Sequence, residues 1–420
     1  MEEDKIKRLP NGTNIIIVND FDYIQGGASK VAIDTANLLV EKNENINVYF
    51  FSGDHNSSSN LNEKVIKICT NQGEALKDKN KVRGIINGIY NFKAKKTLNE
   101  LLKTLDRKKT IIHVHGWTKV LSCSIFDIAF KKKYKLVLTM HDYFTACPNG
   151  GYFNYKSNKI CNLKPLSLRC IKCNCDSRNY FFKIYRLLRE FIQNKVVKLN
   201  LKLTDAISIS EFSEKILKTT LNTNTKIYRI YNPIDLDENI NKKDYRKNEY
   251  YLYVGRISKE KGVDIFCQAI TELKLKGIVV GDGDEKNKLE SKYTNIEFTG
   301  WKNSCEVKEY MKKAKALIMP SRWYEGAPLT PLEALQYGIP SFVSDNCAAS
   351  DIINEKNKTG KTFNLNIEEL KKCIKEFEIQ EINIEILKKF TQNYYVAQLN
   401  NLYDILIKEE KQWFLCYYFY

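Results

Sequence analysis

The feature that most constrains the fold is a repeated alternation of short, β-branched apolar runs with longer helical patterns. Ile15-Ile16-Ile17-Val18 is apolar at four consecutive positions, as in a strand buried on both faces of a parallel sheet. A helical pattern follows from Ser29 to Lys42. Further strands are predicted at Ile46–Phe51, Ile111–Val114, Leu136–Thr139 and Ala206–Ile209. This alternation predicts a doubly wound α/β sheet.

The alternation stops once and then restarts. Asn232-Pro233-Ile234-Asp235 and the polar stretch 237–248 predict a linker. Strand patterns resume at Tyr251–Val254, Gly277–Val280, Ile296–Phe298, Ala316–Met319 and Ser341–Val343. A chain of 420 residues is also long enough for two or three domains. We therefore expect two successive α/β domains, residues 1–230 and 231–383, and a C-terminal helical segment, residues 384–420, that packs back on the first domain.

Basic charge is concentrated in the first of these domains. The formal net charge is +17, and residues 1–230 hold 39 basic and 21 acidic residues, a net of +18. Such asymmetry directs an anionic partner to that domain. Residues 180–203 predict a long basic amphipathic helix in which aromatic side chains interleave with Lys183, Arg186 and Arg189. This pattern favours an anionic membrane surface as the partner, and the alternative is a helix whose aromatic side chains face the domain core.

The sequence contains no pattern for export or for spanning a membrane. No apolar run approaches the ~18 to 20 residues that cross a bilayer. The charged start Met1-Glu2-Glu3-Asp4-Lys5 does not lead into the apolar region of a secretory signal. Twelve cysteines in such a chain indicate a reducing compartment. We therefore expect a cytoplasmic protein that associates peripherally with the inner face of the cell membrane.

Five of the cysteines lie close together between residues 147 and 175, and we call this stretch the cysteine-rich segment. They are Cys147, Cys161, Cys170, Cys173 and Cys175. A Cys-x2-Cys pair with two upstream thiols can hold a structural zinc ion, although the spacing matches no standard zinc finger. The alternatives are free buried thiols and a reversible disulfide. The position of the segment, just after His141-Asp142, predicts an inserted loop.

The strongest chemical signal is the run Ser321-Arg322-Trp323-Tyr324-Glu325-Gly326-Ala327-Pro328-Leu329-Thr330-Pro331-Leu332-Glu333-Ala334. It follows a predicted strand and opens a helix, with Pro331 in the first turn, where its missing N–H costs nothing. The start of such a helix presents free N–H groups and a positive dipole end, which suits a diphosphate. Glu325 precedes the helix and Glu333 lies within it, so the two carboxylates can bind two different sugars, a donor sugar and a ribose.

This run resembles the E-x7-E signature of the retaining glycosyltransferases of family 4, which have the GT-B fold of two facing Rossmann-like domains. The run Val254–Gly262 resembles that family's G-R-x4-K-G loop and places Gly255, Arg256 and Lys261 at the matching positions. Weaker matches follow in the family's order along the chain: Gly26-Gly27, His113-Val114-His115, His141-Asp142, Ile209-Ser210-Glu211 and Asn232-Pro233-Ile234-Asp235.

The resemblance implies an activity and the residues that carry it. The first domain would bind a glycan or lipid-linked acceptor, and the second would bind a nucleotide-sugar donor. A hexose would move between them with retention, in bacterial surface polysaccharide synthesis. Glu325 and His141 would act at the reacting sugar, Arg256 and Lys261 would bind the diphosphate, and Glu333 the ribose. The other donor-binding residues would be Gly26, Gly27, Gly255, Gly326, Pro328 and Leu329.

No metal cofactor is expected for this reaction, because the two cations Arg256 and Lys261 can neutralise the leaving diphosphate. The sequence departs from the family at Ala28-Ser29 and at Asn346–Asp351, where acceptor and nucleotide contacts are expected to differ.

Two other functions fit parts of the pattern. A non-hydrolysing nucleotide-sugar epimerase has the same fold, but it does not need the pairing of Glu325 with Glu333. A nucleic-acid-binding protein would account for the net charge. Because the sequence contains no helix-turn-helix, RNP or zinc-finger pattern, we expect no nucleic-acid partner.

Overall fold

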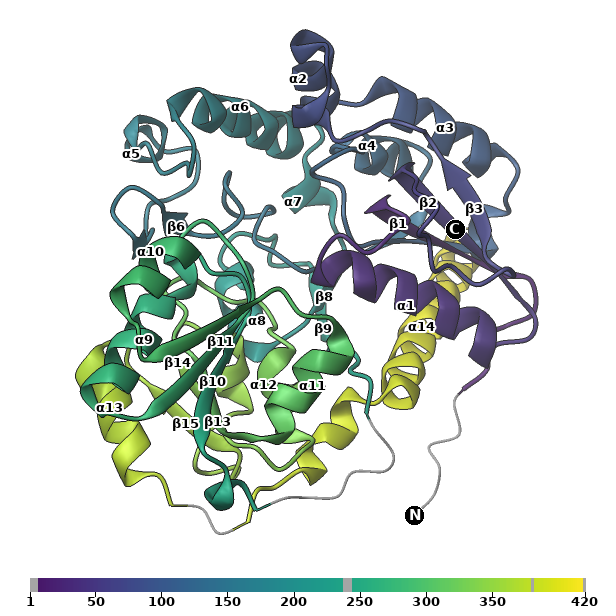
Figure 1. The fold of residues 1–420 in the computed structure, drawn as a ribbon. Helices are drawn as coiled ribbons and strands as arrows, with labels where there is room; N and C mark the ends of the chain where they lie inside the picture. The colour runs from purple at the N-terminus through teal and green to yellow at the C-terminus, as the bar shows by residue number, and fades with distance from the viewer. Residues whose placement is uncertain (1–6, 237–243, 379–380, 418–420) are drawn as a thin grey trace.

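Two separate parallel β-sheets form the centres of the two halves of the molecule (Figure 1). The structure is a computed structural model that describes residues 7–236, 244–378 and 381–417. Strands of the first sheet lie between residues 13 and 229, and those of the second between residues 250 and 363. The predicted fold class is therefore confirmed. Most of the predicted linker, residues 237–243, lies outside the described residues.

The first sheet has seven strands in the order β3-β2-β1-β4-β5-β8-β9, and all its neighbouring strands are parallel. These strands are β1 (Thr13–Phe21), β2 (Ile46–Asp54), β3 (Ile66–Cys69), β4 (Thr110–Val114), β5 (Lys135–Met140), β8 (Asp205–Ser208) and β9 (Lys226–Arg229). Ile15 and Ile17 belong to the core on one face, whereas Ile16 and Val18 belong to the core on the other. Burial on both faces explains the continuous apolar run.

The second sheet has six strands in the order β12-β11-β10-β13-β14-β15, again all parallel. They are β10 (Tyr250–Val254), β11 (Lys276–Val280), β12 (Ile296–Gly300), β13 (Ala314–Met319), β14 (Ser341–Ser344) and β15 (Gly360–Phe363). Its helices are α9 (Val263–Glu272), α10 (Lys286–Lys292), α11 (Ser304–Lys312), α12 (Thr330–Leu335) and α13 (Ile367–Glu376), with short turns η4 (Tyr245–Lys247), η5 (Lys259–Lys261) and η6 (Ala348–Asp351). Separate cores on its two faces give this half its own interior.

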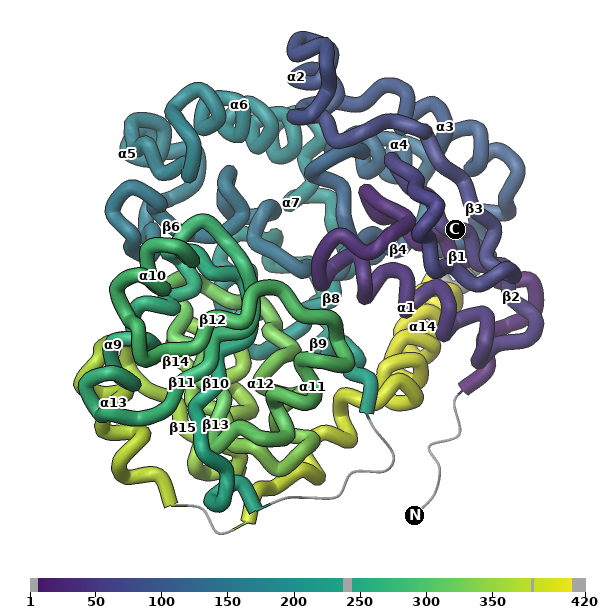
Figure 2. The backbone as a smooth tube through the Cα atoms, in the orientation of Figure 1, coloured from purple at the N-terminus to yellow at the C-terminus, as the bar shows by residue number. Residues whose placement is uncertain are grey.

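The C-terminal segment returns to the first sheet. After the turn η7 (Glu385–Phe390), helix α14 (Gln392–Tyr417) packs beside α1 (Gly27–Lys42) and β4. Figure 2 shows this yellow helix beside the purple N-terminal elements. The hydroxyl groups of Tyr395 and Thr35 lie 2.7 Å apart, and Tyr403 OH lies 2.6 Å from His113 Nδ1. The end of the chain thus completes the core of the first half, although residues 418–420 lie outside the described residues.

The remaining elements surround the first sheet. They are η1 (Ala75–Lys77), α2 (Lys81–Ile89), α3 (Phe92–Lys103), η2 (Arg107–Lys109), α4 (Ser124–Lys131), β6 (Phe153–Asn154), β7 (Lys159–Ile160), α5 (Leu168–Lys172), α6 (Tyr180–Phe191), the π-helical turn η3 (Ile192–Val196), α7 (Leu199–Lys202) and α8 (Glu211–Lys218). The short strands β6 and β7 form an antiparallel pair within the cysteine-rich segment. Among the described residues, no helix is long and apolar enough to cross a membrane.

The prediction of one long helix over residues 180–203 is wrong. Helix α6 passes into the turn η3, and Lys198, with φ of 61°, separates it from α7. A left-handed backbone conformation cannot continue a right-handed helix. Two of the cations expected to face a membrane, Lys183 and Arg189, lie on the buried side of α6.

Candidate active site

A cavity of about 250 Å³ lies between the two halves, and we call it the interdomain cleft. It brings together six of the predicted site residues, namely Gly27, His141, Glu325, Gly326, Pro328 and Leu329. Gly26, Gly255, Arg256, Lys261 and Glu333, which were also predicted, do not line it directly. The cleft is built at the ends of parallel strands, where loops from β5 and β13 face each other.

Glu325 is the centre of a polar network in the cleft. Its Oε1 accepts hydrogen bonds from Lys261 Nζ at 2.6 Å and Trp323 Nε1 at 2.7 Å. The Ser321 hydroxyl donates a third bond, at 2.8 Å. Burial by itself raises the pKa of Glu325, but Lys261 and these hydrogen bonds outweigh it and bring the pKa below its usual value. The carboxylate is therefore charged at neutral pH and firmly positioned.

Both predicted diphosphate-binding cations are paired with carboxylates in this structure. Lys261 pairs with Glu325, and Arg256 Nη2 lies 2.7 Å from Glu260 Oε1. The side chain of Arg256 is 58% exposed, whereas that of Lys261 is 19% exposed. An anion that binds Arg256 therefore has to compete with Glu260 in a partly solvated position. Their roles in donor binding stay predictions.

The backbone around Arg256 needs glycine. A Cβ atom on Gly281 would lie 2.0 Å from the carbonyl oxygen of Gly255, and the φ of Gly281 is 143°. Only glycine adopts this conformation readily at such a close approach. The loops after β10 and β11 are thereby held together, which positions Gly255 and Arg256 at the edge of the second sheet.

Glu333 lies in the first turn of α12 and is partly buried. No other described residue donates a hydrogen bond to its carboxylate. Burial raises its pKa above the usual value, which the positive charge of Lys30 partly offsets. Lys30 itself pairs with Asp34 on the same helix and with Asp235, which follows the first domain in the chain. Glu333 is thus a carboxylate beside the interdomain boundary with free hydrogen-bonding capacity, and its role with ribose stays a prediction.

The two halves touch at Gly326. The Ser210 hydroxyl donates a 2.8 Å hydrogen bond to the Gly326 carbonyl oxygen, and a Cβ on Gly326 would lie 3.2 Å from the backbone oxygen of His141. A side chain at this position would push the two walls of the cleft apart. On the first half, Gly26 adopts a φ of 109° immediately before α1, and Gly27 lines the cleft. Glycine at position 26 therefore allows the sharp turn out of β1.

Three histidines form a chain behind the cleft. Both nitrogen atoms of His113 are engaged, by Tyr403 OH and by the Thr139 hydroxyl, each at 2.6 Å. His115 Nδ1 lies 2.9 Å from His141 Nε2. Burial lowers the pKa of His141 to about 4, so its imidazole is neutral at pH 7. Of the three, only His141 lines the cleft, and His115 orients it, a contact that sequence analysis did not identify.

The loop that departs from the family pattern contacts Glu325 through its backbone. Glu325 N donates to the Asn346 carbonyl oxygen at 3.1 Å, and Ala348 N donates to the Glu325 carbonyl oxygen at 3.0 Å. These are main-chain bonds, so they do not depend on which side chains the loop carries. The departure at 346–351 therefore leaves the position of Glu325 unaffected.

The cysteine-rich segment surrounds a buried lysine. Lys183 Nζ lies 3.2 Å from Cys175 Sγ and 3.5 Å from Cys170 Sγ, and its side chain is only 1% exposed. Cys147 Sγ instead donates to Asn149 Oδ1. Within the described ranges, no three or more cysteine, histidine or acidic side chains lie close enough together to hold a metal ion. The arrangement of the thiols does not fit the predicted zinc site.

The structure also adds residues that the sequence analysis did not assign. Tyr143, Asn232 and Trp323 line the cleft. Gly151 of the cysteine-rich segment approaches Trp323, since a Cβ there would lie 3.4 Å from the indole ring. Trp323 and Tyr143 adjoin the recognised motifs in sequence, which was the available signal. Asn232 begins the match at 232–235, which was its signal, whereas the contribution of Gly151 depends on folding across a long sequence distance.

Known proteins with similar sequences point to one enzyme family. A Klebsiella pneumoniae protein described as an uncharacterized 42.6 kDa protein in the cps region is 25% identical over 341 residues, which are 77% of this chain and 83% of that protein. The Escherichia coli UDP-Gal:alpha-D-GlcNAc-diphosphoundecaprenol alpha-1,3-galactosyltransferase is 31% identical over 145 residues, 29% of this chain and 37% of that enzyme.

Solved structures support the same fold. The lipopolysaccharide outer core galactosyltransferase WaaB, in its apo form, has a TM-score of 0.60 at 17% identity, covering 92% of this chain and 98% of that one. Anabaena Alr3699/HepE in complex with UDP-glucose has a TM-score of 0.55 at 15% identity, covering 95% and 99%.

Family assignments cover both halves of the chain. The family described as Glycosyl transferases group 1 matches residues 236–396, across the second sheet. Glycosyltransferase Family 4 matches residues 25–238, about half of the chain and most of the first sheet. With two parallel-sheet domains that meet at a cleft, the chain belongs to the glycosyltransferases of family 4 and has the GT-B fold.

Proposed function

We propose that this glycosyltransferase moves a hexose from a nucleotide-sugar donor to a hydroxyl group of a glycan or lipid-linked acceptor, with retention at the anomeric carbon. The observation that carries the proposal is the buried Glu325 carboxylate, held by Lys261 in a cleft that it shares with His141. All three hydrogen bonds from neighbouring side chains reach Oε1. Glu325 Oε2 is therefore available to a hydroxyl of the donor sugar.

The expected chemistry follows from the charges of these groups. When the bond between the anomeric carbon and the diphosphate breaks, positive charge develops on the sugar and negative charge on the leaving group. Lys261 and Arg256 supply fixed positive charge for the diphosphate, which lowers the barrier without a metal ion. Neutral His141 can hydrogen-bond a sugar hydroxyl, and Glu333 can bind the ribose hydroxyls.

Bacterial surface polysaccharide synthesis is the process that we propose for this activity. Support comes from relatives: one lies in a cps region, one is a galactosyltransferase that acts on a diphosphoundecaprenol-linked sugar, and WaaB acts in lipopolysaccharide. The names of these relatives favour a sugar acceptor on a lipid carrier or a growing glycan.

A donor panel tests the reaction. Release of nucleoside diphosphate is measured with UDP-glucose, UDP-galactose, UDP-N-acetylglucosamine and GDP-mannose, each with and without an alkyl N-acetylglucosaminyl diphosphate. We expect at least one donor to release nucleoside diphosphate, and EDTA to leave this release unchanged. NMR of the product should show the same anomeric configuration as that of the donor sugar. Inversion of the anomeric centre, or a loss in EDTA that Mg²⁺ restores, would contradict the proposal.

We also propose that the first domain docks on the anionic inner face of the cell membrane. Four apolar side chains of α6, at spacings of three and four residues, are exposed: Phe181 at 60%, Ile184 at 43%, Leu188 at 50% and Phe191 at 50%. They form one stripe on a helix that lies at the outer edge of this domain (Figure 1). The exposed cations Lys172, Lys195, Lys198 and Lys202 lie on neighbouring segments.

An interfacial helix inserts its apolar face and uses nearby cations to attract anionic lipid. Sedimentation with vesicles tests this docking. Binding is expected to require acidic lipid and to fall when Phe181, Leu188 and Phe191 are changed to Ser. Charge reversal at Lys183 or Arg189 would not test this surface, because those side chains are buried. Equal recovery of the triple variant and the wild type with anionic vesicles would refute the docking surface.

A further inference from the structure

A second cavity, of about 810 Å³, adjoins the interdomain cleft. The two cavities share Tyr324, which lies directly before Glu325. The rest of the second cavity belongs mainly to the first domain. Its walls come from the cysteine-rich segment at 161–166, from the region of α6 and η3, and from α8. A molecule in this cavity would therefore lie against the cleft on the side away from the second sheet.

The polar atoms of this second cavity have free hydrogen-bonding capacity. Thr145 Oγ1, Asn194 Oδ1 and Asn200 Oδ1 are buried and have no hydrogen-bond partner, and Thr145 is only 1% exposed. Buried polar atoms without partners are uncommon in folded proteins, because each loses its bonds to water. Three such oxygen atoms on one cavity indicate a ligand that supplies hydrogen-bond donors.

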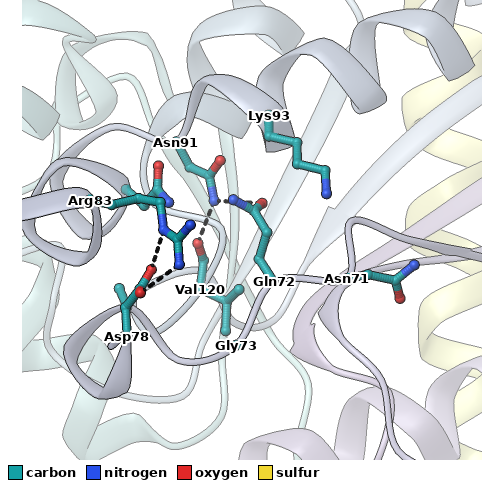
Figure 3. A pocket seen from close by; sticks show the side chains of 10 residues that line it. Asn71, Gln72, Gly73, Asp78, Arg83, Asn91, Lys93 and Val120 are labelled. Atoms are coloured by element: carbon teal, nitrogen blue, oxygen red, sulfur yellow. Dashed lines mark hydrogen bonds and ion pairs between the residues drawn. The ribbon is translucent and has the colours of Figure 1, made fainter. Parts of the chain in front are cut away.

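A third cavity in the same domain provides the contrast. Figure 3 shows that Arg83 is paired with Asp78 and that Asn91 is hydrogen-bonded, whereas Lys93 and Asn71 have no partner among the side chains drawn. Arg83 Nε and Nη2 each lie 2.8 Å from a carboxylate oxygen of Asp78, and Asn91 Nδ2 donates to Gln72 Oε1 at 3.0 Å. That cavity shares no residue with the interdomain cleft. None of its lining residues has a buried side-chain polar atom without a partner, so it gives no comparable sign of a missing ligand.

Glu190 adds a carboxyl group to the second cavity. It is 2% exposed, and its Oε1 accepts a 2.6 Å hydrogen bond from Asn194 Nδ2. Burial raises its pKa to about 7. Together with the oxygen atoms of Asn194 and Asn200, it makes this wall rich in hydrogen-bond acceptors. Hydroxyl groups of a sugar are donors of the kind that such a wall can bind.

Three lysines also line this cavity: Lys164, Lys195 and Lys215. Lys215 is engaged with Glu211 at 2.9 Å, whereas no described carboxylate lies within ion-pair distance of Lys164 or Lys195. Lys164 and Lys195 are both exposed. A cavity with acceptor groups on one wall and ammonium groups at its edge suits a ligand that has both hydroxyl groups and a negative charge.

We propose that the second cavity is the acceptor site and that it binds a sugar carrying a phosphate or diphosphate group. The sugar hydroxyls are bound by Thr145, Asn194 and Glu190, and the anionic group by Lys164 and Lys195. This assignment rests on the proposed transfer reaction, because it makes the shared residue Tyr324 the boundary between acceptor and donor. It names an acceptor chemistry that the cleft by itself does not specify.

Calorimetric binding tests the assignment without relying on turnover. The probes are alkyl diphosphates of glucose, galactose and N-acetylglucosamine, each compared with the uncharged alkyl glycoside of the same sugar, and inorganic diphosphate alone. We expect at least one glycosyl diphosphate to bind about tenfold more tightly than its uncharged glycoside and than inorganic diphosphate. Equal affinities for charged and uncharged glycosides, equal affinity for inorganic diphosphate, or no binding by any glycosyl diphosphate would overturn the proposal.

A matched pair of double variants locates the anion site. Lys164→Gln with Lys195→Gln is expected to weaken binding of the glycosyl diphosphate about tenfold and to leave that of the uncharged glycoside unchanged. Lys159→Gln with Lys172→Gln removes the same charge from exposed positions nearby that do not line the cavity. If both double variants lost the same affinity for the glycosyl diphosphate, the effect would be general electrostatic attraction. That result would overturn the anion site at Lys164 and Lys195.

Thr145→Val separates a binding role from a structural one. The hydroxyl has no partner in the free protein, so valine, of similar shape, is expected to leave the melting temperature unchanged or to raise it. It should nevertheless weaken binding of the glycosyl diphosphate at least threefold. Unchanged affinity together with unchanged stability would show that the Thr145 hydroxyl does not bind the ligand and would refute that contact.

Nucleotide binding distinguishes failure of this inference from failure of the proposed function. UDP and GDP are titrated into the same wild-type and variant proteins. Binding of nucleotide without binding of any glycosyl diphosphate would overturn the acceptor site and leave the transfer reaction standing. Binding of a glycosyl diphosphate without either nucleotide would support the second cavity and contradict the nucleotide-sugar donor.

Discussion

The two sides of the interdomain cleft differ in whether their polar groups already have partners. On the side of the second domain, the charged groups in and behind the cleft are already paired: Glu325 with Lys261, and Arg256 with Glu260. On the side of the first domain, three polar atoms are buried without a partner: Tyr143 OH in the cleft, His115 Nε2 behind it and Thr145 Oγ1 in the second cavity. Paired groups keep their geometry before a ligand arrives, whereas unpaired groups are costly until one binds. Under the proposed function, this difference predicts a preorganised donor side and an acceptor side that its ligand completes.

The sharpest test of the preorganised wall is Glu325→Gln. The variant keeps the shape of the side chain and removes its charge. Loss of a charged hydrogen bond in such a site costs about 2 to 4 kcal/mol, so turnover should fall roughly 30- to 1000-fold. Initial rates of nucleoside diphosphate release measure the effect.

The same variant leaves Lys261 without its counterion, so it should also lower the melting temperature. The double variant with Lys261→Met provides the control. It should regain stability and stay inactive. If activity returned with stability, Glu325 would have only a structural role.

In the first domain, a buried cation is held by main-chain carbonyl oxygens. Arg189 is buried, and it donates to the carbonyl oxygens of Pro148 at 3.1 Å and Thr118 at 3.4 Å. Its guanidinium also lies 4.5 Å from the ring centroid of Phe144. Arg189→Met should therefore lower the free energy of unfolding by about 2 to 3 kcal/mol in urea titrations. Lys195→Met, an exposed change nearby, should stay within about 0.5 kcal/mol of the wild type, and an equal loss in both would contradict the anchoring role of Arg189.

The pH dependence of stability tests two buried titratable groups of the first domain, His141 and Glu190. The folded pKa of His141, about 4, lies below its ordinary value of 6.5, so the unfolded chain binds more protons between these values. The stability that neutral His141 provides is fully present above pH ~6.5 and is lost as the pH falls toward about 4. Glu190 has the opposite sign, because its pKa is raised to about 7 and the folded chain binds the extra proton.

Variants separate the two contributions. When the pH falls from 6.5 to 5.5, the wild type should lose about 1 kcal/mol of stability through His141, since one pKa unit corresponds to about 1.4 kcal/mol. His141→Gln should not show this part of the loss. Glu190→Gln should increase that loss by a similar amount. Urea titrations at the two pH values provide the measurement. A change of the same sign in both variants would contradict the assigned protonation states.

The smallest effect is expected at Glu333, outside the paired network. Glu333→Ala should lower kcat/KM about fivefold, because one hydrogen bond contributes a net of roughly 1 kcal/mol. Most of the loss should appear in the KM for the donor, and the melting temperature should not change, since no other described residue depends on this carboxylate. A change in kcat alone would exclude a role limited to ground-state binding of ribose.

Regular packing made much of the fold predictable. Central strands such as β1 and β13 are apolar because helices cover both faces, and the sequence analysis located them. It did not locate β3, β9 and β15, which are short and carry polar residues. All three are edge strands of their sheets. One side of an edge strand is solvated, so the apolar pattern is weaker there.

The candidate site was predictable in part. The spacing of Glu325 and Glu333 around the start of α12 is local, so the sequence motif alone indicated both. Pairing between Lys261 and Glu325 joins residues 64 positions apart, and the contact between His115 and His141 joins two different strands' ends. Such contacts depend on which strands are neighbours in the sheet, and no local pattern encodes that.

Sequence by itself determined the two α/β domains, the carboxylates of the motif and the basic charge of the first domain. Only the tertiary structure decided where that charge lies. Lys183 and Arg189 are buried, and the apolar side chains of α6 are exposed instead. A helical period of 3.6 residues separates two faces but does not say which one meets the core. That choice is made by the cysteine-rich segment, whose carbonyl and sulfur atoms bind the buried cations.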